Sequence, residues 1–142
     1  MNKLIINLES VYHNLHTIHG WMQEHEKDWS VVTKVLCGHE DTIKALKIMG
    51  VESIGESRIE NLRKIKNVMP DVESWYLRIP APSEIGDVIK YSDASLNSEL
   101  RIIRELDKEA RKQGKTHSII IMIELGDRRE GILPGSLISL YQ

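Results

Sequence analysis

The chain has 142 residues, 41% of them apolar, and a formal net charge of −2 at pH 7. This length fits one domain with a sizeable core, and the near-neutral charge argues against a nucleic-acid-binding or membrane-binding protein. Cys37 is the single cysteine, which excludes an internal disulfide and is typical of a protein from the reducing cytoplasm. The apolar run near the N-terminus is too short for a signal peptide or a membrane span. We therefore expect a small-molecule ligand or another protein chain as the partner.

Residues 3–8 are apolar enough for a short strand, and no hairpin turn follows to supply its neighbour. Apolar side chains then recur at helical spacing from Ser10, which is a suitable N-cap. His13, His16 and His19 lie three residues apart on this helix, but no acidic or thiol ligand of matching spacing accompanies them. We expect solvent-facing histidines here and no metal site.

Residues 30–36 form an apolar, β-branched run that predicts a buried strand, and Gly38 provides its natural end. Lys34 interrupts this run. A lysine in such a place either extends its charge into water or points from the strand end into a pocket. A pocket would favour the neutral, nucleophilic amine, whereas residue chemistry alone favours the solvated one.

The remaining chain repeats one pattern, in which a strand is followed by a short loop and a helix. Strands are predicted over 51–55, 74–79, 93–96 and 118–125, and helices over 40–49, 57–68, 83–90 and 98–113. Ser57 and Glu60 have the spacing of a capping box at the start of one helix. Five such alternations predict an α/β fold with a parallel sheet, either an open doubly wound sheet or part of a (β/α)8 barrel.

In both architectures ligands bind beyond the carboxyl ends of the strands, and the residues expected there are polar or cationic. They are Lys34 to His39, Gly55 to Arg58, Arg78, Asn97 with Ser98, and Gly126 to Glu130. Cations at several strand ends would attract an anionic group such as a phosphate or a carboxylate.

Each of these residues also has a purely structural explanation. The serines and Asn97 can serve as turn or cap residues, and Arg78 can lie in a solvated loop. Residues 127–130 can form a surface ion cluster, which stabilises little, and Cys37 can be a small buried apolar residue. Residue types alone leave these alternatives open.

Five segments, taken in order, resemble the alanine/ornithine racemase-like family of pyridoxal phosphate enzymes. They are 32–38, 54–61, 77–84, 95–99 and 125–132. The resemblance spans nearly the whole chain, and 54–61 also resembles the single-domain pyridoxal phosphate homeostasis proteins. It implies a partial TIM-type (β/α)8 barrel with about five of eight strand–helix units. Residues 1–142 would form the N-terminal portion, with the C-terminal half of the barrel and the β-domain absent.

The same resemblance implies roles for particular residues. Lys34 would form the Schiff base with pyridoxal 5'-phosphate and act as one of the two bases of a racemase. Arg129 would lie near that lysine and the phenolic oxygen of the cofactor. Further cofactor contacts would come from Asn97, Ser98 and Cys37, and substrate contacts from Arg78 and Arg58.

One departure bears on the substrate, because alanine racemases have a tyrosine near the position of Cys37 and this segment is one residue shorter. The resemblance therefore leans towards the ornithine-type branch, with an amino acid as the small-molecule ligand. The alternatives are a non-catalytic pyridoxal phosphate protein of the homeostasis type and a truncated, inactive fragment. Open sheet edges would favour a homodimer or a higher oligomer, and we expect weak or no racemase activity from this chain alone.

Overall fold

The computed structural model describes residues 5–138 and contains one parallel sheet of five strands in the order β1-β2-β3-β4-β5. The strands are β1 (Val31–Val32), β2 (Ser53–Glu56), β3 (Glu73–Tyr76), β4 (Ala94–Asn97) and β5 (Ser118–Ile121). The helices are α1 (Leu8–Glu24), α2 (Glu40–Ile48), α3 (Ile59–Val68), α4 (Ile85–Tyr91) and α5 (Leu100–Gln113). The predicted alternation of strands and helices, with parallel pairing throughout, is confirmed.

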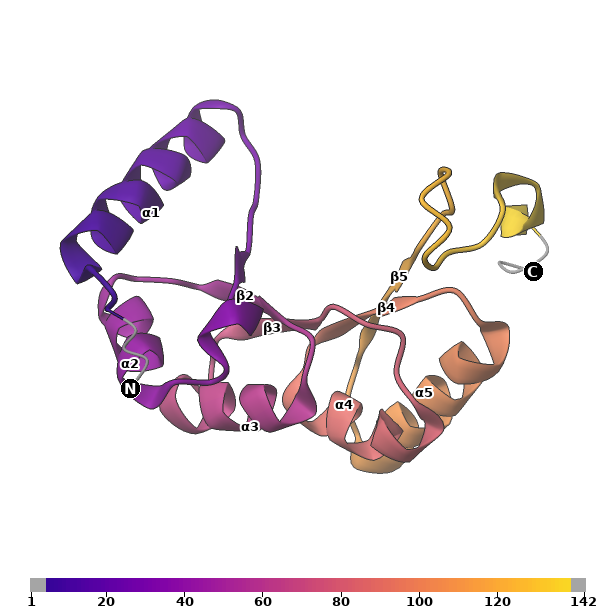
Figure 1. Ribbon diagram of the computed structural model, residues 1–142. Helices are drawn as coiled ribbons and strands as arrows, with labels where there is room; N and C mark the ends of the chain where they lie inside the picture. Colours follow the sequence, from indigo (N-terminus) through magenta and orange to yellow (C-terminus); the bar gives the residue numbers. More distant parts are fainter. Residues whose placement is uncertain (1–4, 139–142) are drawn as a thin grey trace.

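Helices α2 to α5 lie along one face of the sheet, below it in Figure 1. Alternate strand residues point to this face, so Ile54 of β2 and Tyr76 of β3 are fully buried. One cluster joins Ile54 to α2 and α3, and a second joins Tyr76 to α3, α4 and α5. The core is therefore a single layer between the sheet and these four helices.

Helix α1 stands apart from that layer, at the upper left of Figure 1, and none of its residues is buried. The Asn7 side chain accepts a hydrogen bond from the Ser10 backbone N–H, so Asn7 is the N-cap and Ser10 lies inside the helix. The strand predicted over 3–8 is wrong where it can be compared, since residues 5–7 form no strand and Leu8 begins α1. Its residues 3 and 4 lie outside the described part of the chain. No helix among the described residues is long and apolar enough to cross a membrane.

Most predicted boundaries differ from the structure by a few residues, and two differences affect the candidate site. The run 30–36 gives only a two-residue strand, because a 3₁₀ helix η1 (Lys34–Leu36) follows it. The predicted capping box at Ser57 is also wrong, since α3 begins at Ile59 and its N-cap, Arg58, makes no side-chain cap bond.

Candidate site at the carboxyl edge of the sheet

All five strands run parallel, so the loops that follow them leave the same edge of the sheet. Ladder hydrogen bonds continue into three of these loops: Thr33 N–H donates to the Gly55 carbonyl, Leu77 N–H to Glu56 and Met122 N–H to Asn97, at 2.8 to 2.9 Å. We refer to this side as the carboxyl edge. It presents the residues that the sequence singled out.

Lys34 lies immediately beyond β1, in η1, with an exposed side chain. The preceding Thr33 is 1% exposed and anchors the turn to β2, so the backbone that carries Lys34 is fixed. Within residues 5–138 the Lys34 amine makes no hydrogen bond or ion pair. The structure thus places this lysine at a strand end with its nitrogen unpaired.

The turn after Lys34 depends on backbone conformations that favour glycine. Cys37 adopts a left-handed conformation (φ 51°), and so does Gly38 (φ 68°). A Cβ on Gly38 would lie 2.8 Å from the Lys64 side chain and 2.9 Å from that of Asn61, which shows how closely this turn approaches α3. Cys37 is exposed, so its explanation as a buried apolar residue is wrong.

Arg58 follows β2 and is positioned by a buried carboxylate. Oε1 of Glu56, whose side chain is fully buried, accepts hydrogen bonds from the backbone N–H groups of Ser57 (2.6 Å) and Arg58 (3.2 Å). Glu56 therefore holds the two residues that lead into α3, of which Arg58 is the N-cap. The Arg58 side chain is left exposed.

Arg129 belongs to a closed loop beyond β5 that is organised in a similar way. Oε1 of Glu124 accepts hydrogen bonds from the backbone N–H groups of Gly126 and Arg128, and these bonds lower the pKa of the Glu124 carboxyl. At Gly131 (φ 126°) a Cβ would lie 2.6 Å from the Glu124 nitrogen, so only glycine closes this loop without strain. Arg129 is exposed, and its guanidinium makes no ion pair with another described residue.

Two further strand ends carry candidate residues with different surroundings. Asn97, at the end of β4, is fully buried, and its Nδ2 donates to the carbonyl and hydroxyl oxygens of Ser95, both at 2.9 Å. Ser98, which follows it, is half-buried. Arg78 is exposed after β3. Nearby, burial and then the Glu84 carboxylate raise the pKa of the Tyr76 hydroxyl to about 12.

The structure does not gather these candidates into one pocket. Lys34 and Arg129 follow the two outermost strands, β1 and β5, and neighbouring strands lie about 4.8 Å apart, so along the sheet they are separated by on the order of 19 Å. A groove between η1, α2 and α3 is lined by Val35, Cys37, Lys47 and Lys64 among others, but not by Lys34. No described group of three His, Cys, Asp or Glu residues could hold a metal ion.

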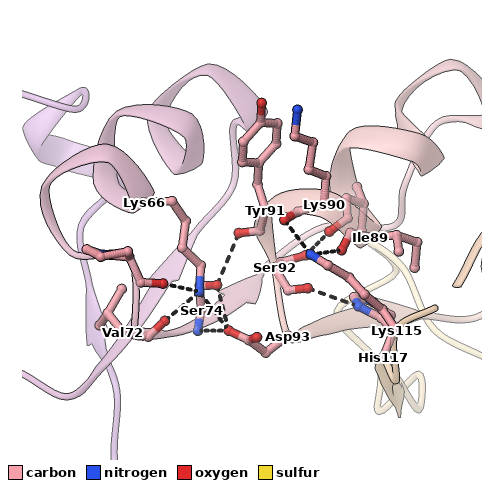
Figure 2. Close-up of polar contacts among 12 residues, drawn as sticks. Lys66, Val72, Ser74, Ile89, Lys90, Tyr91, Ser92, Asp93, Lys115 and His117 are labelled. Atoms are coloured by element: carbon pink, nitrogen blue, oxygen red, sulfur yellow. Dashed lines mark hydrogen bonds and ion pairs between the residues drawn. The ribbon is translucent and has the colours of Figure 1, made fainter. Parts of the chain in front are cut away.

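The opposite, amino edge of the sheet is built from paired side chains (Figure 2). Oδ2 of Asp93 accepts hydrogen bonds from the Ser74 backbone N–H (2.8 Å), the Ser74 hydroxyl (2.9 Å) and the Lys66 amine (3.2 Å). Burial raises the pKa of Asp93, but the hydrogen bonds and the Lys66 charge outweigh it and leave this pKa below its usual value of 3.8. The Lys115 amine is held by two carbonyls of α4.

Glu56 and Glu124 are the two organising residues that sequence reasoning missed. Each lies at or shortly beyond a strand end and is followed within five residues by an arginine at the carboxyl edge. That spacing is the available sequence signal, although glutamate is too common for it to be specific. The predicted cations themselves all lie at this edge, as expected.

The chain matches a known protein family and is similar in sequence to two curated proteins. The family described as alanine racemase, N-terminal domain, matches residues 6–142. An ornithine racemase from Acetoanaerobium sticklandii is 37% identical over 129 residues, which are 91% of this chain and 36% of that protein. A lysine racemase from Thermotoga maritima is 29% identical over 130 residues, which are 92% of this chain and 37% of that protein.

Among solved structures, alanine racemase from Bartonella henselae with covalently bound pyridoxal phosphate has a TM-score of 0.76 and 20% identity. The match covers 95% of this chain and 38% of that one. Its likeness confirms the expected barrel-type α/β fold. The chain thus spans little more than a third of the length of these three relatives. From its sequence match and its parallel sheet, it belongs to the alanine racemase N-terminal domain family.

Proposed function

We propose that this chain provides the lysine-bearing part of a pyridoxal-phosphate-dependent amino-acid racemase. The observation that carries the proposal is the Lys34 amine, exposed directly beyond β1 and unpaired within the described residues. A lysine forms a Schiff base when its amine attacks an aldehyde carbon, which requires an accessible nitrogen that is not held by a neighbouring carboxylate.

The side chains of the carboxyl edge fit the chemistry of this cofactor. Lys34 would hold its aldehyde carbon. Arg129 would hold its phenolic oxygen in a sheet curved into a barrel, where the loops after β1 and β5 face each other across the carboxyl edge. Ser98 and Asn97, at the end of β4, and Cys37, in the turn after Lys34, are the proposed further contacts. When bound, pyridoxal phosphate supplies the electron sink that stabilises negative charge on the substrate α-carbon.

Lys34 is proposed to move the α-proton on one face of the substrate. A single amine returns a proton only to the side from which it came, so racemisation requires a second acid or base on the other face. None of the residues above is assigned that second role.

The proposed substrate is an amino acid with a basic side chain. The two curated relatives are named ornithine racemase and lysine racemase, and Cys37 occupies the region where alanine racemases carry a tyrosine. Arg78 and Arg58, which leave the edge after β3 and β2, would contact the substrate carboxylate.

The proposed domain is the N-terminal portion of an alanine-racemase-type barrel, with β1 to β5 as five of eight strands. Within the described chain, β1 and β5 each pair on one side only. Unpaired parallel edges recruit further strands. We therefore propose that the 142-residue chain self-associates when studied alone.

The test is to add pyridoxal phosphate to the 142-residue chain, reduce with borohydride and locate the label by peptide mass spectrometry. The label is expected on Lys34, together with a visible absorbance band, and both should be lost in Lys34→Ala. Lys112→Ala is the matched control, because the Lys112 side chain is 76% exposed and lies near the end of α5. Label spread over many surface lysines, or no label, would overturn the proposal.

Activity is measured separately, by exchange of the α-hydrogen of ornithine, lysine and alanine in deuterated water. Exchange that disappears in Lys34→Ala supports the racemase assignment. A Lys34 label without any exchange would instead support a non-catalytic pyridoxal-phosphate-binding protein.

A further inference from the structure

A continuous chain of hydrogen bonds connects His117, before β5, with Asn97, at the carboxyl end of β4. His117 Nδ1 lies 3.2 Å from the Ser92 carbonyl oxygen, and Nε2 lies 2.8 Å from the Ser95 hydroxyl. That hydroxyl in turn accepts a hydrogen bond from Asn97 Nδ2 at 2.9 Å. Ser95 and Asn97 are 1% and 0% exposed, so water does not compete along this path.

The acceptors determine the direction of every bond in this chain. A carbonyl oxygen can only accept, so Nδ1 of His117 carries the hydrogen that it shares with Ser92. In the neutral ring Nε2 is then an acceptor and takes the Ser95 hydroxyl hydrogen. The Ser95 oxygen is left to accept from Asn97, which orients the Asn97 amide with nitrogen towards Ser95.

A second proton on the His117 ring changes the donor and acceptor roles along this chain of hydrogen bonds. Nε2 would then donate to the Ser95 oxygen, and the hydroxyl hydrogen would lose its acceptor. The other free acceptor in the chain is Oδ1 of Asn97, which is buried without a partner among the described residues. Reaching it requires the Asn97 amide to turn and give up its bonds to Ser95.

We propose that His117 and Ser95 are positioning residues that set the orientation of the Asn97 amide, and that a proton on His117 releases it. We call this chain of hydrogen bonds from His117 through Ser95 to Asn97 the relay, and it forms without a ligand. Its consequence for cofactor binding rests on the proposed function, in which Asn97 contacts the cofactor. Protonation of His117, before β5, would then weaken cofactor binding at the carboxyl edge.

The surroundings of His117 favour the neutral ring. Burial lowers its pKa below the usual 6.5, partly opposed by the Ser92 hydrogen bond and by Asp93, while the Lys115 charge acts in the same direction as burial. Asp93 and Lys115 are the charged groups that face the ring, and each is already held by the amino-edge network in Figure 2. The folded state therefore binds a proton at His117 less tightly than the unfolded chain does. The contribution of the neutral His117 ring to the free energy of unfolding is lost as the pH falls below 6.5.

The experiment is a pH titration of the 142-residue chain by nuclear magnetic resonance, following the His117 ring nitrogens and the Asn97 side-chain amide. The Asn97 signals are expected to shift with the midpoint of His117. Above that midpoint, the ring should show the tautomer with hydrogen on Nδ1. The inference is overturned if the Asn97 amide does not move, or if the hydrogen is on Nε2.

Two variants make the coupling specific. In Ser95→Ala the Asn97 amide should no longer follow His117, and in His117→Gln it should become independent of pH. Ser92→Ala is the matched control, since the Ser92 hydroxyl bonds to Val88 and the relay uses its backbone carbonyl instead. Coupling that persists in Ser95→Ala contradicts the relay. The Lys34 label in the wild type, by contrast, tests the cofactor proposal independently.

Discussion

The cations at the two edges of the sheet have opposite surroundings. At the amino edge, the amines of Lys66 and Lys115 are bonded to backbone carbonyls, and Lys66 also pairs with Asp93 (Figure 2). At the carboxyl edge, none of the exposed cations forms an ion pair with another described residue: Lys34, Arg58, Arg78 and Arg129. Paired cations stabilise the fold, whereas unpaired cations are available to a ligand. This division is the one found in α/β barrels, where stability and chemistry lie at opposite ends of the strands.

The carboxyl edge is nevertheless ordered, by backbone contacts in place of side-chain pairs. Glu56 and Glu124 each accept hydrogen bonds from backbone N–H groups of the loop that follows. Gly38 lets its turn pack closely against α3, and Gly131 lets its loop pack closely against the Glu124 backbone. Their arginines are therefore carried on fixed loops while the guanidinium groups stay free. Preorganised loops with unpaired side chains suit a binding site.

The largest loss of local stability is expected from Gly131→Ala, in the loop beyond β5 at the carboxyl edge. The new Cβ would collide with the Glu124 backbone at a positive φ, which costs about 3 kcal/mol. The Glu124 and Ile132 amides, which are bonded across the loop, should then exchange hydrogen about 100-fold faster. Gly126→Ala has a positive φ but no atom within 4 Å of the Cβ, so its effect should be smaller. Equal effects would show that strain, not collision, shapes the loop.

The second largest loss of stability is expected at the amino edge, from Asp93→Ala. This change leaves the buried Ser74 N–H without its acceptor and removes the charge partner of Lys66, at a cost of about 2 kcal/mol in the free energy of unfolding. Denaturant unfolding measures it. Asp107→Ala is the control, because its pair with Arg111 lies within α5 at the surface. A loss no larger than that of the control would mean that the amino edge does not stabilise the fold.

The smallest effect is expected from Lys34→Ala. The side chain is exposed and unpaired within the described residues, so the unfolding free energy should change by less than about 0.5 kcal/mol. The same denaturant experiment measures this change. A clear loss of stability would assign Lys34 a structural role and remove the contrast between the edges.

Much of the fold could be predicted because its signals are local. The apolar periodicity of 98–113 and the glycine at 114 correctly predicted α5 and its end, since Gly114 has the left-handed conformation that closes a helix. The run around Lys34 was predicted less well. Its β-branched residues favour a strand, but the left-handed turn at Cys37 and Gly38 ends the strand early.

The positions of the candidate cations also followed from the sequence, because parallel strands send all their following loops to one edge. The roles of Glu56 and Glu124 could not be predicted in this way. A glutamate reads as a solvated surface residue unless its burial is known, and Glu56 is fully buried.

The sequence by itself determined the alternation of strands and helices, the edge at which Lys34 lies and the family resemblance, since these depend on patterns within short segments. Only the tertiary structure decided which cations are paired and how His117 reaches Asn97. Those contacts join residues far apart in the chain, such as Lys66 with Asp93 and Ser95 with His117, 27 and 22 positions apart. No local pattern encodes such a pairing, because it exists only once the strands have aligned.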